Sequence, residues 1–381
     1  MRVLMVSDVY YPRINGVSTS IENFRRKLTS CNIEVLLVAP RYENEIHEHG
    51  ITRVTSRKVP GSPEDRLSNW KELKNAVFDA AQHCDLIHIQ TPFMAHYAGI
   101  NAARKLNIPV ISTYHTLFEE YFHHYIPFLP RKILKNLTQY YSRLQCNALD
   151  AIIVPSTAMQ TRLLEYAVST PIHVLPTGIS LSSFDSVDGK HFRLKYAISK
   201  DRPIALFVGR VAREKNIDFL LEAIHYTLAK CPDTLLIIAG DGPAMSDLKS
   251  TARSGGLQNA VKFIGYQDHK HELPGCYAAA NVFVFASRTE TQGLVLLEAM
   301  AAGLPVIAFS EMGTEDILKH KRGCLIPPYD AEKFGNEIAG VLNSREMQQQ
   351  LSDAAKDYAR TWSDDITSKH LATLYKSLIT A

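Results

Sequence analysis

Residues 2–40 read RVLMVSDVYYPRINGVSTSIENFRRKLTSCNIEVLLVAP, and this stretch decides the fold. Residues 2–7 are almost entirely apolar, as expected of a strand that is buried on both faces. A turn-rich loop at 8–16 follows, and apolar residues then recur at the spacing of a helix over 17–29. The apolar run at 34–40 is a second strand. A strand, a loop, a helix and a strand in this order predict a doubly wound parallel sheet.

The same alternation continues along the chain and predicts two similar units. Strands are predicted at 85–90, 108–114, 150–155 and 171–176, and then at 203–208, 234–239, 261–265, 282–286, 305–309 and 324–327. We expect an α/β protein with two tandem Rossmann-like, doubly wound domains that face a cleft. Ligands of such sheets bind at the carboxyl ends of the strands, so this cleft is the expected active site. The expected boundaries are 1–180 for the first domain, 181–200 for a linker, 201–360 for the second domain, and 361–381 for a C-terminal helix that can cross back to the first domain.

Composition and charge exclude several classes of protein. The 381 residues are 46% hydrophobic and 21% charged, which is ordinary for a globular chain. The net charge of +3 is too small to indicate nucleic acid as a partner. No run approaches the ~20 apolar residues of a membrane span, and no secretory signal is visible. The six cysteines are scattered singly, which indicates reduced thiols. We expect a cytoplasmic protein that is peripheral on the cytoplasmic face of a membrane.

Two loops carry residues suited to phosphate groups. Asn15-Gly16 precedes a helix, where backbone N–H groups can approach a phosphate, although a glycine at this position is also typical of a plain turn. FVGRVAREKN at 207–216 ends a strand and brings Arg210, Arg213 and Lys215 together, which suits a diphosphate. The alternative for this second loop is a solvated, charged turn.

The stretch SRTETQGLVLLEAMAAG at 287–303 is the most informative one. Glu290 lies in a loop, and Glu298 lies eight residues further on, inside an apolar helix. A carboxylate in so apolar a helix is costly unless it is hydrogen-bonded. A spacing of eight is about two helical turns, so we expect the two carboxylates on one side of the helix, where they suit a polyhydroxylated ligand. The alternative for either residue alone is an exposed helix charge.

Taken together, these motifs resemble the retaining glycosyltransferases of family four, which have the GT-B fold. The resemblance rests on TETQGLVLLEAMAAGLPVI at 289–307, GRVAREKN at 209–216, FIGY at 263–266, AGDGP at 239–243 and AANVFVFAS at 279–287. In the first domain, Asn15-Gly16, Tyr114-His115-Thr116 and Pro176-Thr177-Gly178 match as well. The resemblance therefore covers essentially the whole chain.

The resemblance implies a role for each of these residues. The first domain would lie on the acceptor side and the second would bind a nucleotide sugar, with Arg210 and Lys215 on the donor diphosphate. Glu298 would accept from the ribose hydroxyls, and Glu290 would contact the sugar near the reacting carbon. The implied catalytic residues are His115, Arg210, Lys215 and Glu290, and the other donor-binding residues are Asn15, Gly16, Gly209, Thr291, Gln292, Gly293, Leu294 and Glu298. For His115, a core histidine beside a strand end is the alternative.

The family reaction proceeds on one face of the sugar, and the leaving phosphate takes the proton of the acceptor. Catalysis then consists of charge stabilisation on the diphosphate. No D-x-D motif is present, so we expect neither a metal nor a cofactor, since the nucleotide sugar is a substrate. Two positions depart from the family pattern: Ser180 stands where Asp is frequent, and Gln292 where Phe is frequent. The Gln form is similar to diacylglycerol glucosyltransferases and related lipid enzymes.

The stretch FEEYFHHYIPFLPRKILKNLTQYYSRL at 118–144 suggests the acceptor, because no acidic residue lies between Glu120 and Asp150. A helix from residue 130 would carry an apolar stripe beside basic residues, which suits an anionic membrane surface. The alternative is a stripe that packs on its own domain. We expect the membrane or acceptor to contact Tyr121, Phe122, Arg131, Lys132 and Lys135.

Three functions fit the sequence. The first is transfer of a hexose, from UDP-glucose or a similar donor, to a lipid such as diacylglycerol. The second is a soluble transferase of the same fold that acts on a polysaccharide or a small molecule. The third is a non-catalytic nucleotide-sugar-binding protein, which the intact set of Arg210, Lys215, Glu290 and Glu298 disfavours. The sequence leaves open UDP or GDP and glucose, galactose, mannose or glucuronic acid.

Overall fold

The chain folds into two compact units, one made of Met1–Gly178 with Asp364–Ala381 and the other of Ile179–Ser363. The structure is a computed structural model that describes residues 1–13, 15–43, 45, 48–59, 62–115, 131–185, 187–269 and 271–380. For residues 62–63 and 131–135 it describes the backbone.

Unit 1 is built on a seven-stranded sheet in the order β3-β2-β1-β6-β7-β8-β9, with every neighbouring pair parallel. Its central strand β1 is completely buried from Val3 to Val6, as the apolar run at 2–7 predicts. A separate antiparallel hairpin, β4-β5, lies outside this sheet. The strands are β1 (Arg2–Val6), β2 (Glu34–Pro40), β3 (Ile51–Val54), β4 (Ser56–Val59), β5 (Ser62–Ser68), β6 (Leu86–Ile89), β7 (Val110–Thr113), β8 (Ala151–Val154) and β9 (Ile172–Val174).

The helices of unit 1 follow the strands as crossovers. Asn15 caps the first of them, because its Oδ1 accepts a hydrogen bond of 2.9 Å from the Ser18 N–H. The helices are α1 (Gly16–Leu28), α2 (Trp70–Ala81), α3 (Met94–Leu106), α5 (Arg131–Cys146), α6 (Thr157–Glu165) and α15 (Asp364–Ile379), with a short 3-10 turn η1 (Thr29–Cys31).

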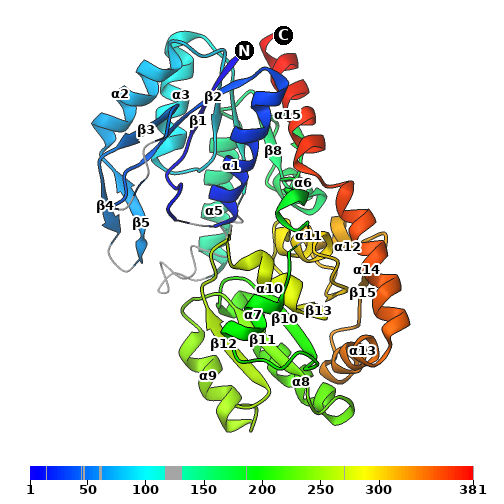
Figure 1. The fold of residues 1–381 in the computed structure, drawn as a ribbon. Coiled ribbons are helices and arrows are strands. Elements are labelled where there is room, and N and C mark those ends of the chain that lie inside the picture. The colour runs from blue at the N-terminus through cyan, green and yellow to red at the C-terminus, as the bar shows by residue number, and fades with distance from the viewer. Residues whose placement is uncertain are drawn as a thin grey trace. The chain divides into compact units, whose positions relative to one another are not determined.

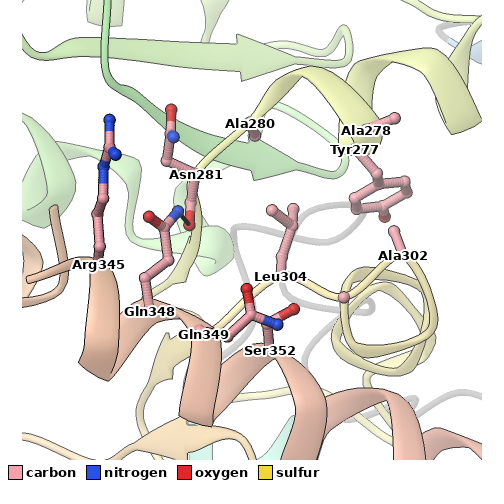
Figure 2. A pocket seen from close by; sticks show the side chains of 11 residues that line it. Tyr277, Ala278, Ala280, Asn281, Ala302, Leu304, Arg345, Gln348, Gln349 and Ser352 are labelled. Carbon is pink, nitrogen blue, oxygen red and sulfur yellow. Dashed lines mark hydrogen bonds between the residues drawn. The ribbon is translucent and has the colours of Figure 1, made fainter. Parts of the chain in front are cut away.

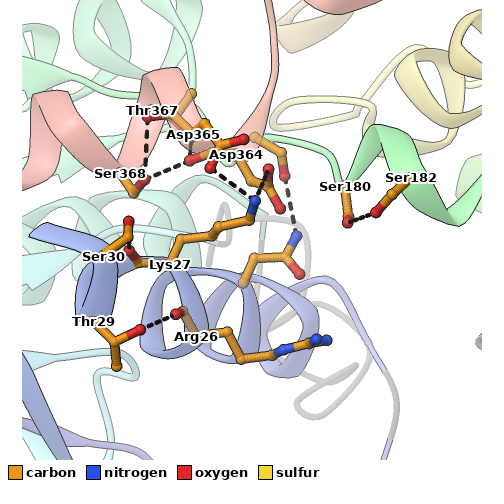
Figure 3. A network of polar contacts seen from close by, with 12 residues as sticks. Arg26, Lys27, Thr29, Ser30, Ser180, Ser182, Asp364, Asp365, Thr367 and Ser368 are labelled. Atoms are coloured by element: carbon orange, nitrogen blue, oxygen red, sulfur yellow. Dashed lines mark hydrogen bonds and ion pairs between the residues drawn. The ribbon is translucent and has the colours of Figure 1, made fainter.

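The C-terminal helix α15 is part of unit 1, although it follows unit 2 in the chain. It lies beside α1, as Figure 1 shows, and buries Leu371, Ala372 and Tyr375 in the core of this unit. At its first turn, Lys27 Nζ on α1 lies 3.1 Å from the Asp364 carboxylate and 2.8 Å from that of Asp365 (Figure 3). Burial of the apolar side chains supplies most of the stability of this contact.

Unit 2 has a six-stranded parallel sheet in the order β12-β11-β10-β13-β14-β15. Its strands are β10 (Ile204–Val208), β11 (Leu235–Ala239), β12 (Val261–Gly265), β13 (Val282–Phe285), β14 (Val306–Ala308) and β15 (Cys324–Leu325). Its helical segments are η2 (Leu181–Ser183), α7 (Lys190–Lys195), η3 (Arg213–Lys215), α8 (Ile217–Lys230), α9 (Met245–Ser254), α10 (Leu273–Ala279), α11 (Leu294–Ala301), α12 (Gly313–Leu318), α13 (Ala331–Asn343) and α14 (Arg345–Arg360).

The stretch 181–200, which the sequence suggests is a linker, carries regular structure. It contains η2 and α7, and Phe192 of α7 is buried in the core of unit 2. Gly178 and Asp364 lie close together where the chain leaves and re-enters unit 1, since a Cβ at Gly178 would lie 2.5 Å from the Asp364 Cα.

Both sheets reverse their strand order once, and these two points position the site. In unit 1 the switch lies between β1 and β6, and in unit 2 between β10 and β13. A parallel sheet opens a crevice at the carboxyl ends of the two strands that flank such a switch. The loops that border these crevices therefore begin at Ser7 and Gln90 in unit 1 and at Gly209 and Ala286 in unit 2.

Candidate active site

The switch point of unit 2 brings Arg210, Lys215 and Glu290 to one edge of its sheet. Arg210 and Lys215 follow β10, and Glu290 follows β13. Two hydrogen bonds tie these loops together: Asn216 Nδ2 donates to Ala286 O at 3.3 Å, and Ser287 Oγ donates to Glu214 O at 3.2 Å. Residues 75 positions apart in sequence are thereby held at one edge.

Charges of both signs meet there. The Lys215 ammonium pairs with a Glu290 carboxylate oxygen, and both side chains are largely buried. The Arg210 guanidinium is half exposed, with Nη1 3.9 Å from Glu214 Oε1. An anionic ligand here would therefore meet Arg210 at the surface and Lys215 below it.

Backbone packing between two loops explains the AGDGP stretch at 239–243. The Gly209 N–H donates to Ala239 O at 3.0 Å, and the Val211 N–H donates to Asp241 O at 2.9 Å. A Cβ at Gly240 would lie only 1.8 Å from the Gly209 carbonyl oxygen, so a side chain there cannot be accommodated. The 239–243 loop thus fixes the backbone that presents Gly209 and Arg210.

Helix α11 begins directly after the Glu290 loop. Its N-cap, Gly293, has a φ of 94°, a conformation that glycine adopts without strain. As a glycine, the N-cap makes no side-chain hydrogen bond, and no acidic residue lies in the first turn of the helix. A helix N-terminus attracts anions, and Thr291, Gln292 and Leu294 border it.

The relation expected between the two carboxylates is wrong. Glu290 lies in the loop, and α11 begins only at Leu294, so the pair does not share one side of a helix. The left-handed backbone at Gly293 separates the loop from the helix and breaks the helical periodicity between them.

Glu298 is buried and hydrogen-bonded. Its Oε1 lies 2.9 Å from His269 Nε2, and its Oε2 accepts from the Tyr277 hydroxyl at 2.8 Å. Only 5% of Glu298 is exposed. The partners that the apolar helix demands are therefore present.

The site residues of unit 1 lie at its own switch point. His115 follows β7, and its Nε2 lies 3.0 Å from Gln90 Oε1 at the end of β6. Burial lowers the pKa of His115 from 6.5 to about 4, so it is neutral at pH 7. The Gln90 amide nitrogen is buried and has no hydrogen-bond partner among the described residues. No described atom lies within 4 Å of a Cβ placed on Gly16, so internal packing does not require a glycine there.

Helix α5 presents an apolar face to solvent. Its packed face consists of Thr138, Ser142 and Cys146, and Ser142 Oγ lies 3.0 Å from the Tyr114 hydroxyl. Tyr121 and Phe122 lie outside the described residues, and Arg131, Lys132 and Lys135 lie on α5 with side chains that are not described. The exposed face carries Leu137 (49% exposed), Tyr140 (51%), Tyr141 (54%) and Leu144 (49%).

A pocket of about 360 Å³ in unit 2 lies away from these residues (Figure 2). Asn281 and Leu304 line it and precede β13 and β14, so it lies at the amino ends of the strands. Gln348 on α14 spans it with a 2.9 Å hydrogen bond from Nε2 to Asn281 O. Because ligands of parallel sheets bind at the carboxyl ends, we place the active site at the opposite edge.

The described part of the chain shows neither a cluster of metal ligands nor a membrane-spanning helix. No three or more His, Cys, Asp or Glu side chains gather there into a group that could hold a metal ion. Nor is any helix in that part both long and apolar enough to cross a membrane.

Sequence reasoning missed His269, Tyr277 and Gln90. Tyr277 lies two residues before AANVFVFAS and His269 lies three residues after FIGY, so both are close to recognisable motifs. Tyr277 reaches Glu298 from α10 and His269 from the loop before α10, so these contacts depend on tertiary structure and leave no sequence pattern.

Two doubly wound parallel units, with cations and carboxylates gathered at one switch point, define a glycosyltransferase of the GT-B class. The chain matches the model of glycosyl transferases group 1 over residues 189–358 and that of Glycosyltransferase Family 4 over residues 14–183. The expected fold class, two tandem Rossmann-like units, is confirmed. A solved structure of Anabaena HepE in complex with UDP superposes with a TM-score of 0.77 at 18% identity, over 99% of this chain and 100% of that one.

Curated relatives extend over most of the chain. The α-monoglucosyldiacylglycerol synthase of Streptococcus pneumoniae is 33% identical over 352 residues, 90% of this chain and 77% of that protein. The synthase of the same name from Acholeplasma laidlawii is 28% identical over 405 residues, 100% of this chain and 98% of that protein. The chain therefore belongs to the family-four GT-B glycosyltransferases, as the resemblance in sequence indicates, and it is a glycosyltransferase.

Proposed function

We propose that this enzyme transfers a hexose from a nucleotide sugar, UDP-glucose or a similar donor, to a diacylglycerol-like lipid with retention of configuration at the anomeric carbon. One observation carries the proposal. Arg210, Lys215, Glu290 and Glu298 gather around the switch point of unit 2, in a chain similar over most of its length to two α-monoglucosyldiacylglycerol synthases.

The donor diphosphate is proposed to bind between Arg210, Lys215 and the N-terminus of α11. Both side chains carry a full positive charge, and the helix end contributes partial charges and backbone N–H groups. The diphosphate competes with Glu290 for Lys215, so donor binding releases the Glu290 carboxylate toward the sugar. Glu298 is proposed to accept hydrogen bonds from the ribose.

The leaving diphosphate is proposed to take the proton of the acceptor hydroxyl as the C1–O bond breaks. Negative charge then grows on the phosphate oxygens, and Arg210 and Lys215 stabilise it more in the transition state than in the ground state. His115 is neutral at pH 7 because burial lowers its pKa, so it orients the sugar or acceptor by hydrogen bonding. We propose that the two cations meet the charge demand without a metal or another cofactor.

The acceptor side is proposed to be a membrane surface that contacts α5. Gln145 on α5 donates to Pro92 O at 2.8 Å and to the Tyr97 hydroxyl at 3.3 Å, so α5 lies beside the start of α3. Phe93 (56% exposed) and Tyr97 (52%) therefore extend the exposed apolar face of α5. The Arg143 guanidinium lies over the Tyr140 ring, 5.7 Å from its centroid, so a positively charged side chain borders this face.

Apolar and aromatic side chains that face solvent beside basic residues suit the interface of an anionic bilayer. Because this face of α5 is exposed, the alternative in which the stripe packs on its own domain is disfavoured for Leu137, Tyr141 and Leu144. The six cysteines form no disulfide. This supports a reducing compartment, so we propose that the enzyme acts at the cytoplasmic face of the membrane, with no nucleic acid as a partner.

A donor and acceptor panel tests the function. The purified protein is incubated with UDP-glucose, UDP-galactose, UDP-glucuronic acid or GDP-mannose and with vesicles that contain diacylglycerol, and the lipid extract is read by mass spectrometry. We expect a hexosyl-diacylglycerol from one UDP-hexose. Transfer to soluble sugars but not to lipid would instead support the soluble enzyme, and donor binding without any turnover would support the non-catalytic protein.

Vesicle flotation tests the membrane contact separately. Leu144→Ser on α5 should reduce binding to vesicles that contain phosphatidylglycerol. Leu164→Ser on α6 is the matched control, because Leu164 is exposed to a similar extent (58%) but lies on another helix of unit 1. Equal flotation of the two variants would contradict the role of α5.

A further inference from the structure

Glu298 is held from two sides by residues that no motif assigns. Tyr277 on α10 is fully buried and donates to Oε2 at 2.8 Å. His269, in the loop between β12 and α10, lies 2.9 Å from Oε1 and is partly exposed. Each carboxylate oxygen therefore has one partner.

The surroundings of Glu298 make these partners necessary. The neighbouring side chains Leu296, Leu297, Ala299 and Met300 are completely buried. An ionised carboxylate in such a setting is costly without hydrogen bonds. Burial and the adjacent carboxylate raise the pKa of Tyr277 well above its usual range, so its hydroxyl stays protonated and donates at any pH the enzyme meets.

The remaining lone pairs of Glu298 match a vicinal diol. A carboxylate can accept about four hydrogen bonds, two at each oxygen. Among the described residues, Tyr277 bonds Oε2 and His269 bonds Oε1, which leaves about one acceptor position on each oxygen. Two adjacent ribose hydroxyls can donate to one such position each.

We propose that Tyr277 and His269 are positioning residues that fix the Glu298 carboxylate so that each oxygen accepts one hydroxyl of the nucleotide ribose. This inference rests on the donor site proposed above. A glutamate side chain that binds a ligand from a mobile state loses rotamer entropy on binding. Because the two partners hold Glu298 in place before the ligand binds, much of that entropy is already lost on folding. The fixed carboxylate then accepts from the 2′-hydroxyl, so the enzyme distinguishes ribonucleotides from deoxyribonucleotides.

The discrimination between UDP and 2′-deoxy-UDP, measured by calorimetry, tests this inference. If GDP binds more tightly than UDP, GDP and 2′-deoxy-GDP are used instead. We expect the wild-type protein to prefer the ribonucleotide by roughly tenfold, the ratio that corresponds to one hydrogen bond to a charged group. Tyr277→Phe should weaken UDP binding by a similar factor, change 2′-deoxy-UDP binding little, and so bring the ratio close to one.

Variants at the second partner and a matched tyrosine complete the design. His269→Ala should also reduce the ratio, and His269→Gln should restore it, because an amide N–H can donate to Oε1. Tyr358→Phe is the control, since it removes a hydroxyl from another buried tyrosine of unit 2, and it should keep the wild-type ratio. In steady-state assays the positioning variants should raise KM for the donor and keep kcat, which a general loss of folded protein would not do.

Two outcomes separate the inference from the ribose role proposed for Glu298. Wild-type ratios in both Tyr277→Phe and His269→Ala, while Glu298→Ala loses the discrimination, would overturn the inference alone. A wild-type ratio in Glu298→Ala would overturn the ribose role of Glu298 and the inference with it. If Tyr277→Phe fails to fold, His269→Ala decides the matter, because His269 is partly exposed and lies in a loop.

Discussion

Unit 1 should lose stability on mild acidification, because it buries histidines in their neutral form. His88 on β6 is completely buried, with Nδ1 2.6 Å from the Tyr375 hydroxyl and Nε2 2.7 Å from Thr113 Oγ1. Burial, with a smaller contribution from His115, lowers its pKa from 6.5 to about 3. Burial lowers the pKa of His96 on α3 to about 4.

The sign and the size of the effect follow from these values. The unfolded chain binds a proton at each histidine below pH 6.5, whereas the folded state does not until about pH 4 or 3, so stability falls as the pH falls through this window. At pH 5 each histidine costs roughly 2 kcal/mol, from 1.36 kcal/mol per pH unit below 6.5. Asp8 acts in the opposite direction, because burial raises its pKa to about 6. Its protonation in the folded state returns about 1.4 kcal/mol at pH 5. His115 is buried in its neutral form as well, so the three histidines together cost about 6 kcal/mol and the net loss is about 4.6 kcal/mol.

Hydrogen exchange resolved by unit is the assay, after correction for the intrinsic pH dependence of exchange. Protection of β6, β7 and α15 should fall between pH 7 and pH 5 more than protection of β10 and β13. His88→Gln should remove about 2 kcal/mol of this pH dependence. His320→Gln, at an exposed histidine of unit 2, should leave it unchanged. Equal losses in both units, or a His88→Gln protein with the wild-type pH dependence, would refute the reasoning.

Four further predictions concern the donor site, the C-terminal helix and the membrane. Arg210→Ala should lower kcat/KM by an amount that corresponds to ~3 kcal/mol or more of lost transition-state stabilisation. Near wild-type turnover by a folded variant would contradict its role on the leaving group. Glu298→Ala should mainly weaken the binding of the nucleoside diphosphate, and Glu290→Ala should mainly lower turnover. Calorimetry and steady-state kinetics measure the two effects, and the reverse pattern would show that the assignment is inverted. Deletion of 364–381 should cost unit 1 roughly 4 kcal/mol or more by exposing its core, and an unchanged thermal transition would exclude this. Changing Arg131, Lys132 and Lys135 together to Ser should weaken binding to anionic vesicles by about 3 kcal/mol at low ionic strength. Unaltered flotation of this variant would contradict the charge argument.

The fold could be predicted because its central strands are buried on both faces. Runs such as 2–7 and 203–208 are continuous and apolar, and each ends within one or two residues of the observed strand. Strand β3 escaped prediction because Ile51–Val54 is a short edge strand with a charged residue at Arg53. The adjacent hairpin β4-β5 is equally polar, so its strands carry no hydrophobic signal.

The candidate site could be predicted only where the interacting residues lie in the same short sequence motif. Arg210 and Lys215 lie in one short loop, so their proximity was readable from the sequence. The approach of Glu290 to Lys215 depends on the pairing of β10 with β13. The hydrogen bonds to Glu298 on α11 come from α10 and from the loop before it. Such contacts are set by tertiary packing, which leaves no local pattern.

Helix α5 shows why periodicity alone does not determine which face packs. Leu137, Tyr141 and Leu144 lie at the predicted spacing, and hydrophobicity alone would turn them inward. The helix instead packs through Thr138, Ser142 and Cys146, because small side chains allow close approach and Ser142 meets the Tyr114 hydroxyl. Hydrogen bonding on the inner face therefore leaves the apolar residues on the outer face.

The anomeric configuration of the lipid product tests the central claim most directly. The enzyme is given UDP-α-glucose, or whichever UDP-hexose the panel selects, with diacylglycerol in anionic vesicles, and the product is examined by proton NMR at C1. The account predicts an α-linked hexosyl-diacylglycerol from the wild-type protein and none above background from Arg210→Ala. A β-linked product, or equal amounts of product from the two proteins, would contradict it.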